Sequence, residues 1–247
     1  MGNLSYNLVD LEDYGLTVLD GGAENIARAF EAMQLQNKAQ GWTSRLKPRG
    51  ITLPVTIKAS SAENIHTVLS QARQYLNQGD ACKLALSEIA GRYWWARFTG
   101  FTGNLISPKT WAGEVQFAVE DPRAFSTSED ANTHNVPADP TTVVETNGGT
   151  AYVEPVILLT AQDTLAVITL KVQNMGTGEE LTWDGSLVAT NTVEIDVVNY
   201  LVKKNGVADM ADVAGQFPTL QPGANNIKVT AFGTNGNIKF TYRDAYI

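Results

Sequence analysis

The residues best suited to chemistry in this sequence are its two histidines, His66 and His134. Neither has a cysteine or a second histidine at the spacing that zinc ligands require. No G-x-S-x-G motif is present, so nothing ties either imidazole to a nucleophilic serine. We therefore expect a protein without enzymatic activity, without a metal and without a cofactor.

Two acidic residues, Glu194 and Asp196, form a second arrangement that catalysis could use. Residues two apart on a strand share a face with their backbones about 7 Å apart, a separation that suits paired glycosidase carboxylates. Val193, Ile195 and Val197 alternate with them, as in any half-exposed strand. We interpret the pair as surface charges, and a hydrolase stays open only if carboxylates converge in a cleft.

An aromatic strand predicted over residues 92–98 is the most informative local pattern. Alternation places Tyr93, Trp95 and Arg97 on one face, while the opposite face is apolar enough to join a core. Tyr, Trp and Arg are enriched at the energetic centres of protein interfaces. We therefore predict a protein interface at these three residues. The alternative is that a loop or helix of the same domain covers them.

Trp183 suggests a different function. It stands in the run Trp183-Asp184-Gly185 at a predicted turn, and an exposed tryptophan on the rim of a β-sandwich can stack on a sugar ring. The more ordinary interpretation is a partly buried core residue. A carbohydrate-binding module is therefore the alternative function, with Trp183 as its contact, or Trp111 if that side chain is exposed over a polar groove.

The composition restricts the partners of the chain. Its 247 residues include 18 Lys and Arg against 26 Asp and Glu, and the net charge of −8 disfavours binding to a phosphate backbone. A single cysteine, Cys82, excludes an intramolecular disulfide. No apolar run approaches the roughly 18 residues of a membrane span, and no export signal is visible. We expect neither nucleic-acid contact nor membrane insertion.

The N-terminal half is predicted to be a β-rich domain over residues 1–127 with one packed helix. Ser60 to Glu63 match a capping box, and the residues that follow repeat apolar side chains at helical spacing, which predicts a helix over about 61–77. Strands are predicted over 51–58, 82–88, 92–98 and 114–120. Pro54 places the first of these at a sheet edge or a bulge.

The C-terminal half is predicted to be entirely β-structure. Residues 128–150 are rich in Ser, Thr, Asn, Pro and Gly with little periodicity, so we interpret them as a linker. From residue 151 to residue 247 apolar and polar residues alternate in short runs between turn signals, as in a β-sandwich. Asn205-Gly206 predicts a hairpin turn. The predicted fold class is therefore mostly β, in two domains.

Several motifs resemble those of the distal tail protein (Dit) family of siphophages. In the first half these are Gly91–Gly100, Trp111–Phe117 and Asp121–Phe125, and in the second half Thr177–Gly185, Phe217–Asn225 and Phe240–Ile247. Each motif alone is weak, because it consists largely of turn and strand residues. Their order and spacing make the resemblance fairly specific, and it covers nearly the whole chain.

The resemblance implies a structural hub at the tip of a phage tail. Its N-terminal domain would form a hexameric ring at the end of the tail tube, and its C-terminal domain would be a galectin-like β-sandwich, or jelly roll. The ring would join the tube or tape-measure protein to a tail-associated spike or lysin and would hold receptor-binding proteins. The protein would fold in the bacterial cytoplasm and end in the virion. The alternative, sugar binding, would aid adhesion to the host surface.

Overall fold

The structure is a computed structural model that describes residues 4–7, 9–19, 49–62, 64–119, 121–137, 140–162, 168–232 and 235–247. It divides into two compact units: unit 1 is Met1–Thr127 with Ile247, and unit 2 is Ser128–Tyr246. Both consist mainly of antiparallel strands, and the described residues contain one α-helix. The predicted mostly-β fold with a helix in its N-terminal half is confirmed.

Unit 1 is an antiparallel sheet with a helix on one face. Its elements are β1 (Leu4–Tyr6), β2 (Val9–Asp10), the 3-10 helix η1 (Leu11–Tyr14), β3 (Leu16–Val18), β4 (Arg49–Lys58), α2 (Ile65–Leu76), β5 (Cys82–Leu86), β6 (Arg92–Ser107), β7 (Thr110–Val119) and β8 (Ala124–Ser126). The main sheet has the order β2-β1-β5-β6-β7-β4-β3. β8 pairs with the start of β6.

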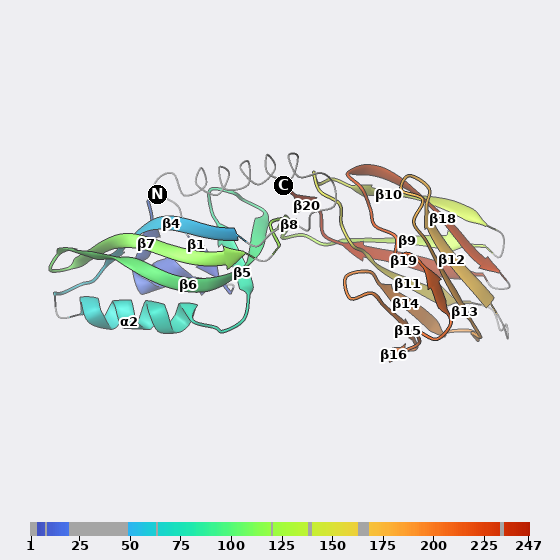
Figure 1. Cartoon of the computed structure of the whole chain (residues 1–247), viewed down its shortest axis with the longest axis horizontal. Helices are drawn as coiled ribbons and strands as arrows, with labels where there is room; N and C mark the ends of the chain where they lie inside the picture. The colour runs from blue at the N-terminus through green and yellow to red at the C-terminus, as the bar shows by residue number, and fades with distance from the viewer. Residues whose placement is uncertain are drawn as a thin grey trace. The chain divides into compact units, whose positions relative to one another are not determined.

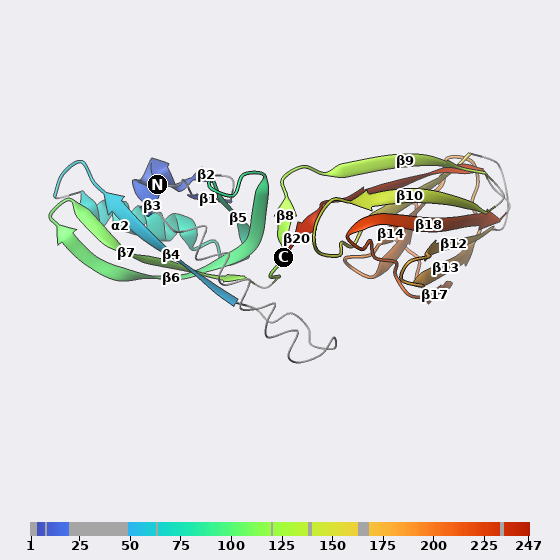
Figure 2. The same ribbon diagram turned by 90° about the horizontal axis from the view of Figure 1, so that it is seen from above.

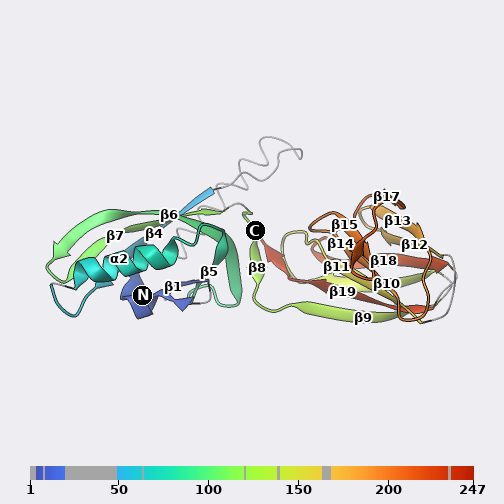
Figure 3. The same cartoon turned by 90° about the horizontal axis from the view of Figure 1, so that it is seen from below.

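Helix α2 covers one face of this sheet (Figures 1 and 3). It is shorter at its start than predicted, because its N-cap is Asn64 and no side chain caps it. Instead of capping the helix, Ser60 accepts a hydrogen bond from Asn64 Nδ2 at 3.2 Å, and Glu63 lies outside the described residues. The predicted capping box is therefore wrong, but the apolar stripe is correct, with Ile65, Leu69, Ala72 and Leu76 buried.

Strand β4 lies inside the sheet, between β7 and β3. The expectation that Pro54 marks an edge strand or a bulge is wrong. Within β4, the pairing with β3 covers residues 55–57, so Pro54 lies immediately before the paired residues. Its carbonyl accepts a hydrogen bond from the backbone N–H of Leu19. Since proline lacks only the N–H, a position just outside the ladder on one side tolerates it within an interior strand.

Tyr6 is a fully buried residue of β1. Its hydroxyl donates to the carbonyl of Ala96 at 3.1 Å, and the hydroxyl of Tyr75 in α2 donates to the carbonyl of Tyr6 at 2.9 Å. Burial, with a further contribution from neighbouring Cys82, raises the pKa of Tyr6 to about 12. The folded unit therefore favours the neutral phenol.

Unit 1 is expected to lose stability at alkaline pH through Tyr6. A tyrosine of the unfolded chain ionises near pH 10, so the stabilising contribution is full below that pH and is lost as the pH rises through about 12. We expect the free energy of unfolding of unit 1 to fall by about 2 kcal/mol over this range. Urea unfolding followed by tryptophan fluorescence measures the decline. Tyr6→Phe should flatten it, and an unchanged slope in that variant would contradict the assignment.

Unit 2 is built from two antiparallel sheets and one short strand, β20, that belongs to neither of them. Its strands are β9 (Asp130–Val136), β10 (Thr141–Asn147), β11 (Val156–Ala161), β12 (Ile168–Asn174), β13 (Glu180–Gly185), β14 (Thr192–Asp196), β15 (Leu201–Lys204), β16 (Val207–Ala208), β17 (Val213–Gly215), β18 (Gly223–Phe232), β19 (Gly236–Tyr242) and β20 (Ala245–Tyr246). The five-stranded sheet has the order β10-β18-β12-β13-β17, and the six-stranded sheet the order β16-β15-β14-β11-β19-β9. Their alternately buried side chains form the core of a sandwich, and the galectin-like character stays a prediction.

The stretch 128–150, predicted to be a linker, holds two strands. β9 pairs with β19 at one edge of the six-stranded sheet (Figure 3), while β10 pairs with β18 (Figure 2). The predicted hairpin after β15 is present, because Asn205 and Gly206 adopt positive φ angles of 50° and 80° between β15 and β16. The two-residue turn thus has the backbone that Asn-Gly favours.

Candidate functional site

The surface predicted from Tyr93, Trp95 and Arg97 is only partly exposed. Trp95 is 40% exposed and Arg97 also faces solvent, whereas Tyr93 is only 4% exposed. Tyr93 pairs with Phe125 of β8, whose ring lies 6.0 Å away between centroids. The alternative of cover by the same unit is therefore correct for Tyr93 and does not apply to Trp95 or Arg97.

Lys83 gives this surface a cation beside its aromatic rings. The register of β5 and β6 places Lys83 opposite Trp95. Its ammonium lies 4.7 Å from the ring centroid of Tyr93 and 5.8 Å from that of Trp95, within the range of cation–π attraction. The exposed group is thus Trp95 with Lys83 and Arg97, which suits contact with a protein surface. We call it the Trp95 surface.

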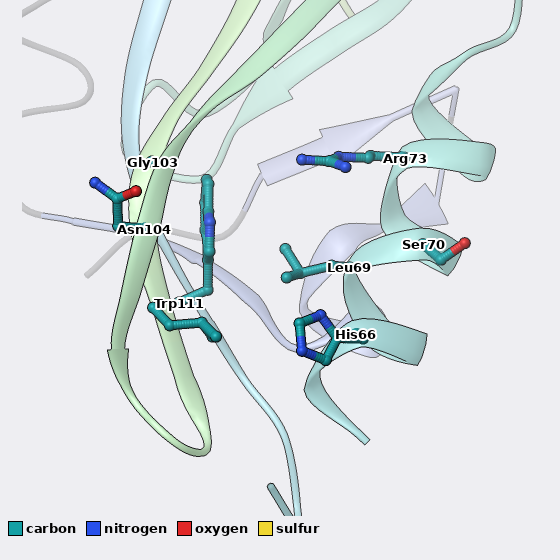
Figure 4. Close-up of a pocket in the computed structure, with 8 residues that line it drawn as sticks. His66, Leu69, Ser70, Arg73, Gly103, Asn104 and Trp111 are labelled. Atoms are coloured by element: carbon teal, nitrogen blue, oxygen red, sulfur yellow. The ribbon is translucent and has the colours of Figure 1, made fainter. Parts of the chain in front are cut away.

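A second candidate is a groove between α2 and the β6–β7 hairpin, which we call the helix–hairpin groove (Figure 4). It has a volume of about 340 Å³. His66, Leu69 and Arg73 point from the helix toward Trp111 of β7, which forms the opposite wall (Figure 4). Sequence reasoning missed this groove, although His66, Leu69 and Arg73 lie at helical spacing and share one side of the helix.

Two glycines shape the wall of the helix–hairpin groove. Gly103 of β6 and Gly113 of β7 are paired directly across the hairpin. A Cβ at Gly103 would lie 2.6 Å from the indole of Trp111, and one at Gly113 would lie 2.7 Å from it. Both distances are shorter than real Cβ contacts, so only glycine leaves room for the indole to lie across the two strands.

A third candidate is a carboxylate inside unit 2. Glu145 of β10 is fully buried and accepts three hydrogen bonds from side chains of the other sheet. The donors are Asn132 Nδ2 at 2.9 Å, His134 Nε2 at 2.5 Å and the hydroxyl of Tyr242 at 3.1 Å. We call this group the Glu145 cluster. Because its donors come from β9 and β19, it ties the two sheets together.

The electrostatics around Glu145 fit a structural role. Burial, followed by the neighbouring charge of Glu145, raises the pKa of the Tyr242 hydroxyl. Burial and the charges of Asp244 and Glu145 also raise the pKa of Asp130. The carboxylate is saturated with donors from its own unit, so we assign the cluster to structure. Sequence reasoning saw His134 only as a loop residue.

The structure does not support Trp183 or Trp111 as an exposed sugar contact. Trp183 is 0% exposed, and its Nε1 donates to Asp209 Oδ2 at 3.2 Å, so it is a core residue. Trp111 is also buried. Stacking on a sugar needs an exposed ring face, and the carbohydrate hypothesis loses the two residues on which it rested.

Glu194 and Asp196, the pair that a hydrolase could use, are both bonded to neighbouring residues of unit 2. Glu194 accepts a hydrogen bond from Lys203 Nζ at 2.6 Å, and Asp196 binds the backbone and side chain of Asn199. Within the described ranges, no group of His, Cys, Asp and Glu is arranged to hold a metal ion. The described part of the chain also contains no helix long and apolar enough to cross a membrane.

Comparison with known protein families gives one match. Residues 148–246 match the family model described as the siphovirus-type tail component, C-terminal domain. This range covers nearly all of unit 2 after β10. No curated protein matches the chain.

Comparison with solved structures extends the likeness to both units. The crystal structure of the Dit protein of phage SPP1, described as a paradigm of the hub adsorption apparatus in phages that infect Gram-positive bacteria, is similar with a TM-score of 0.71 and 15% identity over 100% of both chains. Two structures of the phage P2 baseplate, with Ca and with Sr, give TM-scores of 0.44 and 0.42 at 8% and 9% identity, over 98% and 97% of each chain. The SPP1 likeness establishes the fold, and with the family match it confirms the resemblance to distal tail proteins.

Proposed function

We propose that this chain, whose C-terminal unit matches siphovirus-type tail components, is a structural hub of a phage tail tip. The observation that carries the proposal is the likeness to the SPP1 hub protein over the full length of both chains. The family match over residues 148–246 supports it independently, because it rests on sequence. The hub is not an enzyme, and its place is the virion, after folding and assembly in the bacterial cytoplasm.

The hub consists of a hexameric ring formed by unit 1. A ring needs two different patches on each subunit that meet head to tail. The Trp95 surface supplies one of them, since an exposed tryptophan flanked by cations has the composition of an interface centre. The ring connects the tail tube or tape-measure protein to a tail-associated spike or lysin, and it holds receptor-binding proteins. A sugar-binding role is not proposed, because Trp183 and Trp111 are buried.

The state of assembly tests this proposal. Light scattering after size exclusion, with negative-stain images of the same peak, is expected to show rings of six copies or two such rings stacked. A protein that remains a single chain at every concentration would contradict the ring.

Trp95→Ala is expected to weaken ring assembly without unfolding unit 1. Truncating a residue at an interface centre costs about 2 kcal/mol or more, so the concentration at which rings dissociate should rise at least about tenfold. Light scattering over a dilution series measures this. Tyr200→Ala is the matched control, because Tyr200 is also an exposed aromatic residue but lies in unit 2. Equal dissociation of both variants would rule out the Trp95 surface.

A further inference from the structure

We propose that the helix–hairpin groove binds an acidic side chain from an exposed segment of a partner protein, together with an apolar neighbour of that side chain. The proposal goes beyond ring formation, because it concerns a surface on the helix side of unit 1. The groove is defined by His66, Leu69, Ser70, Arg73, Gly103, Asn104, Leu105 and Trp111.

The charge of the groove selects the acidic side chain. Its lining includes Arg73 and His66 and no carboxylate, although the chain as a whole carries a net charge of −8. The cation is Arg73, which forms no ion pair with an acidic side chain among the residues that the structure describes. A carboxylate that enters here meets the positive charge of Arg73.

Aromatic rings hold Arg73 in position for such a contact. Its guanidinium carbon lies 5.7 Å from the ring centroid of Phe101, within cation–π range. Phe101 in turn packs edge-on against Trp111, with 5.5 Å between ring centroids. Stacking uses the face of the guanidinium and leaves its N–H groups free to form the paired hydrogen bonds that carboxylates accept.

The apolar walls require a second feature of the occupant. Leu69 and Trp111 face each other across the groove (Figure 4). At the rim, the hairpin continues with Leu105, which is 46% exposed, and Ile106, which is 67% exposed. An apolar strip longer than the groove itself suits a protein segment with an apolar residue beside its acidic one, rather than a small anion.

Fluorine NMR on the full chain labelled with 5-fluorotryptophan tests the proposal. The chain has five tryptophans, and Trp111→Phe assigns the signal of the groove. The probe is an acetylated and amidated tripeptide of Leu, Glu and Leu, and the matched probe replaces Glu with Gln. We expect the Trp111 signal to shift with the Glu peptide and the Gln peptide to bind at least about tenfold more weakly.

Two variants locate the charge that binds the peptide. Arg73→Gln should weaken binding of the Glu peptide about tenfold, because it removes the planar cation and leaves a shorter, neutral polar side chain. Lys239→Gln changes the net charge equally but lies on β19 of unit 2, so it should leave binding unchanged. Equal affinity for both peptides, or a loss that is the same in both variants, would overturn the proposal.

Two further outcomes would assign the groove to other occupants and overturn the proposal. Inorganic phosphate that shifts the Trp111 signal as strongly as the Glu peptide would indicate a general anion site. A shift that depends on protein concentration without any peptide would assign the groove to a second copy of the chain. The NMR signal reports binding in the groove, and light scattering reports ring assembly. Each proposal can therefore fail without affecting the test of the other.

Discussion

Replacement of Glu145 by alanine is expected to lower the free energy of unfolding of unit 2 by about 3–5 kcal/mol. The carboxylate is fully buried and is the shared acceptor of Asn132, His134 and Tyr242. Its removal leaves the buried hydroxyl of Tyr242 and the half-buried imidazole of His134 facing a cavity, and a buried donor without an acceptor cannot recover its hydrogen bond from water. Because β9 and β19 belong to the other sheet, the loss acts across the sandwich.

Trp183 provides a specific readout for this experiment. It is fully buried and is the only tryptophan in the sequence of unit 2, so its fluorine signal in urea follows that unit alone. Glu145→Gln keeps one carbonyl acceptor and should cost less than the alanine variant. Glu180→Ala is the matched control, since its side chain is 41% exposed and lies 3.9 Å from Lys171, and it should change stability by no more than about 0.5 kcal/mol. If Glu145→Ala were as mild as Glu180→Ala, the Glu145 cluster would not hold the sheets together.

Gly113→Ala is expected to destabilise unit 1 by about 3 kcal/mol. The added Cβ would lie 2.1 Å from the carbonyl oxygen of Thr102 and 2.6 Å from the Cα of Gly103. Both are backbone atoms within the β6–β7 ladder, so the clash cannot be relieved by rotating a side chain. The indole of Trp111, 2.7 Å away, would also have to move. The helix–hairpin groove should therefore change shape along with the loss of stability.

Gly100→Ala provides the matched control for Gly113→Ala. Gly100 lies on β6 of the same hairpin, but a Cβ there would meet nothing within 4 Å. In thermal unfolding, the melting temperature of the control should be close to that of the parent protein, and that of the Gly113 variant should be much lower. The fluorine signal of Trp111 should shift in the folded Gly113 variant only. Equal melting temperatures for the two variants would show that the close approach at Gly113 is not limiting.

The elements that the sequence predicted well share a simple hydrophobic pattern. The stripe of α2 and the alternation in β14 and β19 mark inward faces that are apolar apart from the hydroxyl of Tyr242. For such elements, burial of apolar surface decides both the structure and its orientation, so the pattern in the sequence is sufficient. The Asn-Gly turn was predictable for a different reason, because its positive φ angles restrict the residue type directly.

The elements that were missed bury polar side chains. β10 turns Val143, Glu145 and Asn147 inward, and the exposed Asn132 and half-buried His134 of β9 reach the carboxylate of Glu145. Neither strand alternates cleanly between apolar and polar residues, so the stretch 128–150 was interpreted as a linker. The partners that make such burial favourable come from other strands, and no local pattern reveals them.

The candidate sites failed to emerge from sequence for a related reason. Tyr93 and Trp95 share a strand face, yet β8 covers one and leaves the other exposed. The helix–hairpin groove joins side chains of α2 to Trp111 on β7, through an approach that two glycines allow. Tertiary contacts of this kind decide whether a side chain is exposed, whereas sequence periodicity indicates only the face of the strand or helix on which it lies.

The polar side chains of β9 have a consequence for how copies of the chain avoid pairing with one another. β9 is the last strand in its sheet, and a bare strand edge is a template on which another chain can add a strand. An apolar β9 would favour such stacking and thus insoluble aggregates. β9 instead carries exposed polar side chains, among them Asn132, Thr133 and Asn135, and it is held by its pairing with β19, by the buried Val136 and by hydrogen bonds to Glu145. Exposed polar side chains along an edge strand disfavour the addition of a strand from another copy of the chain.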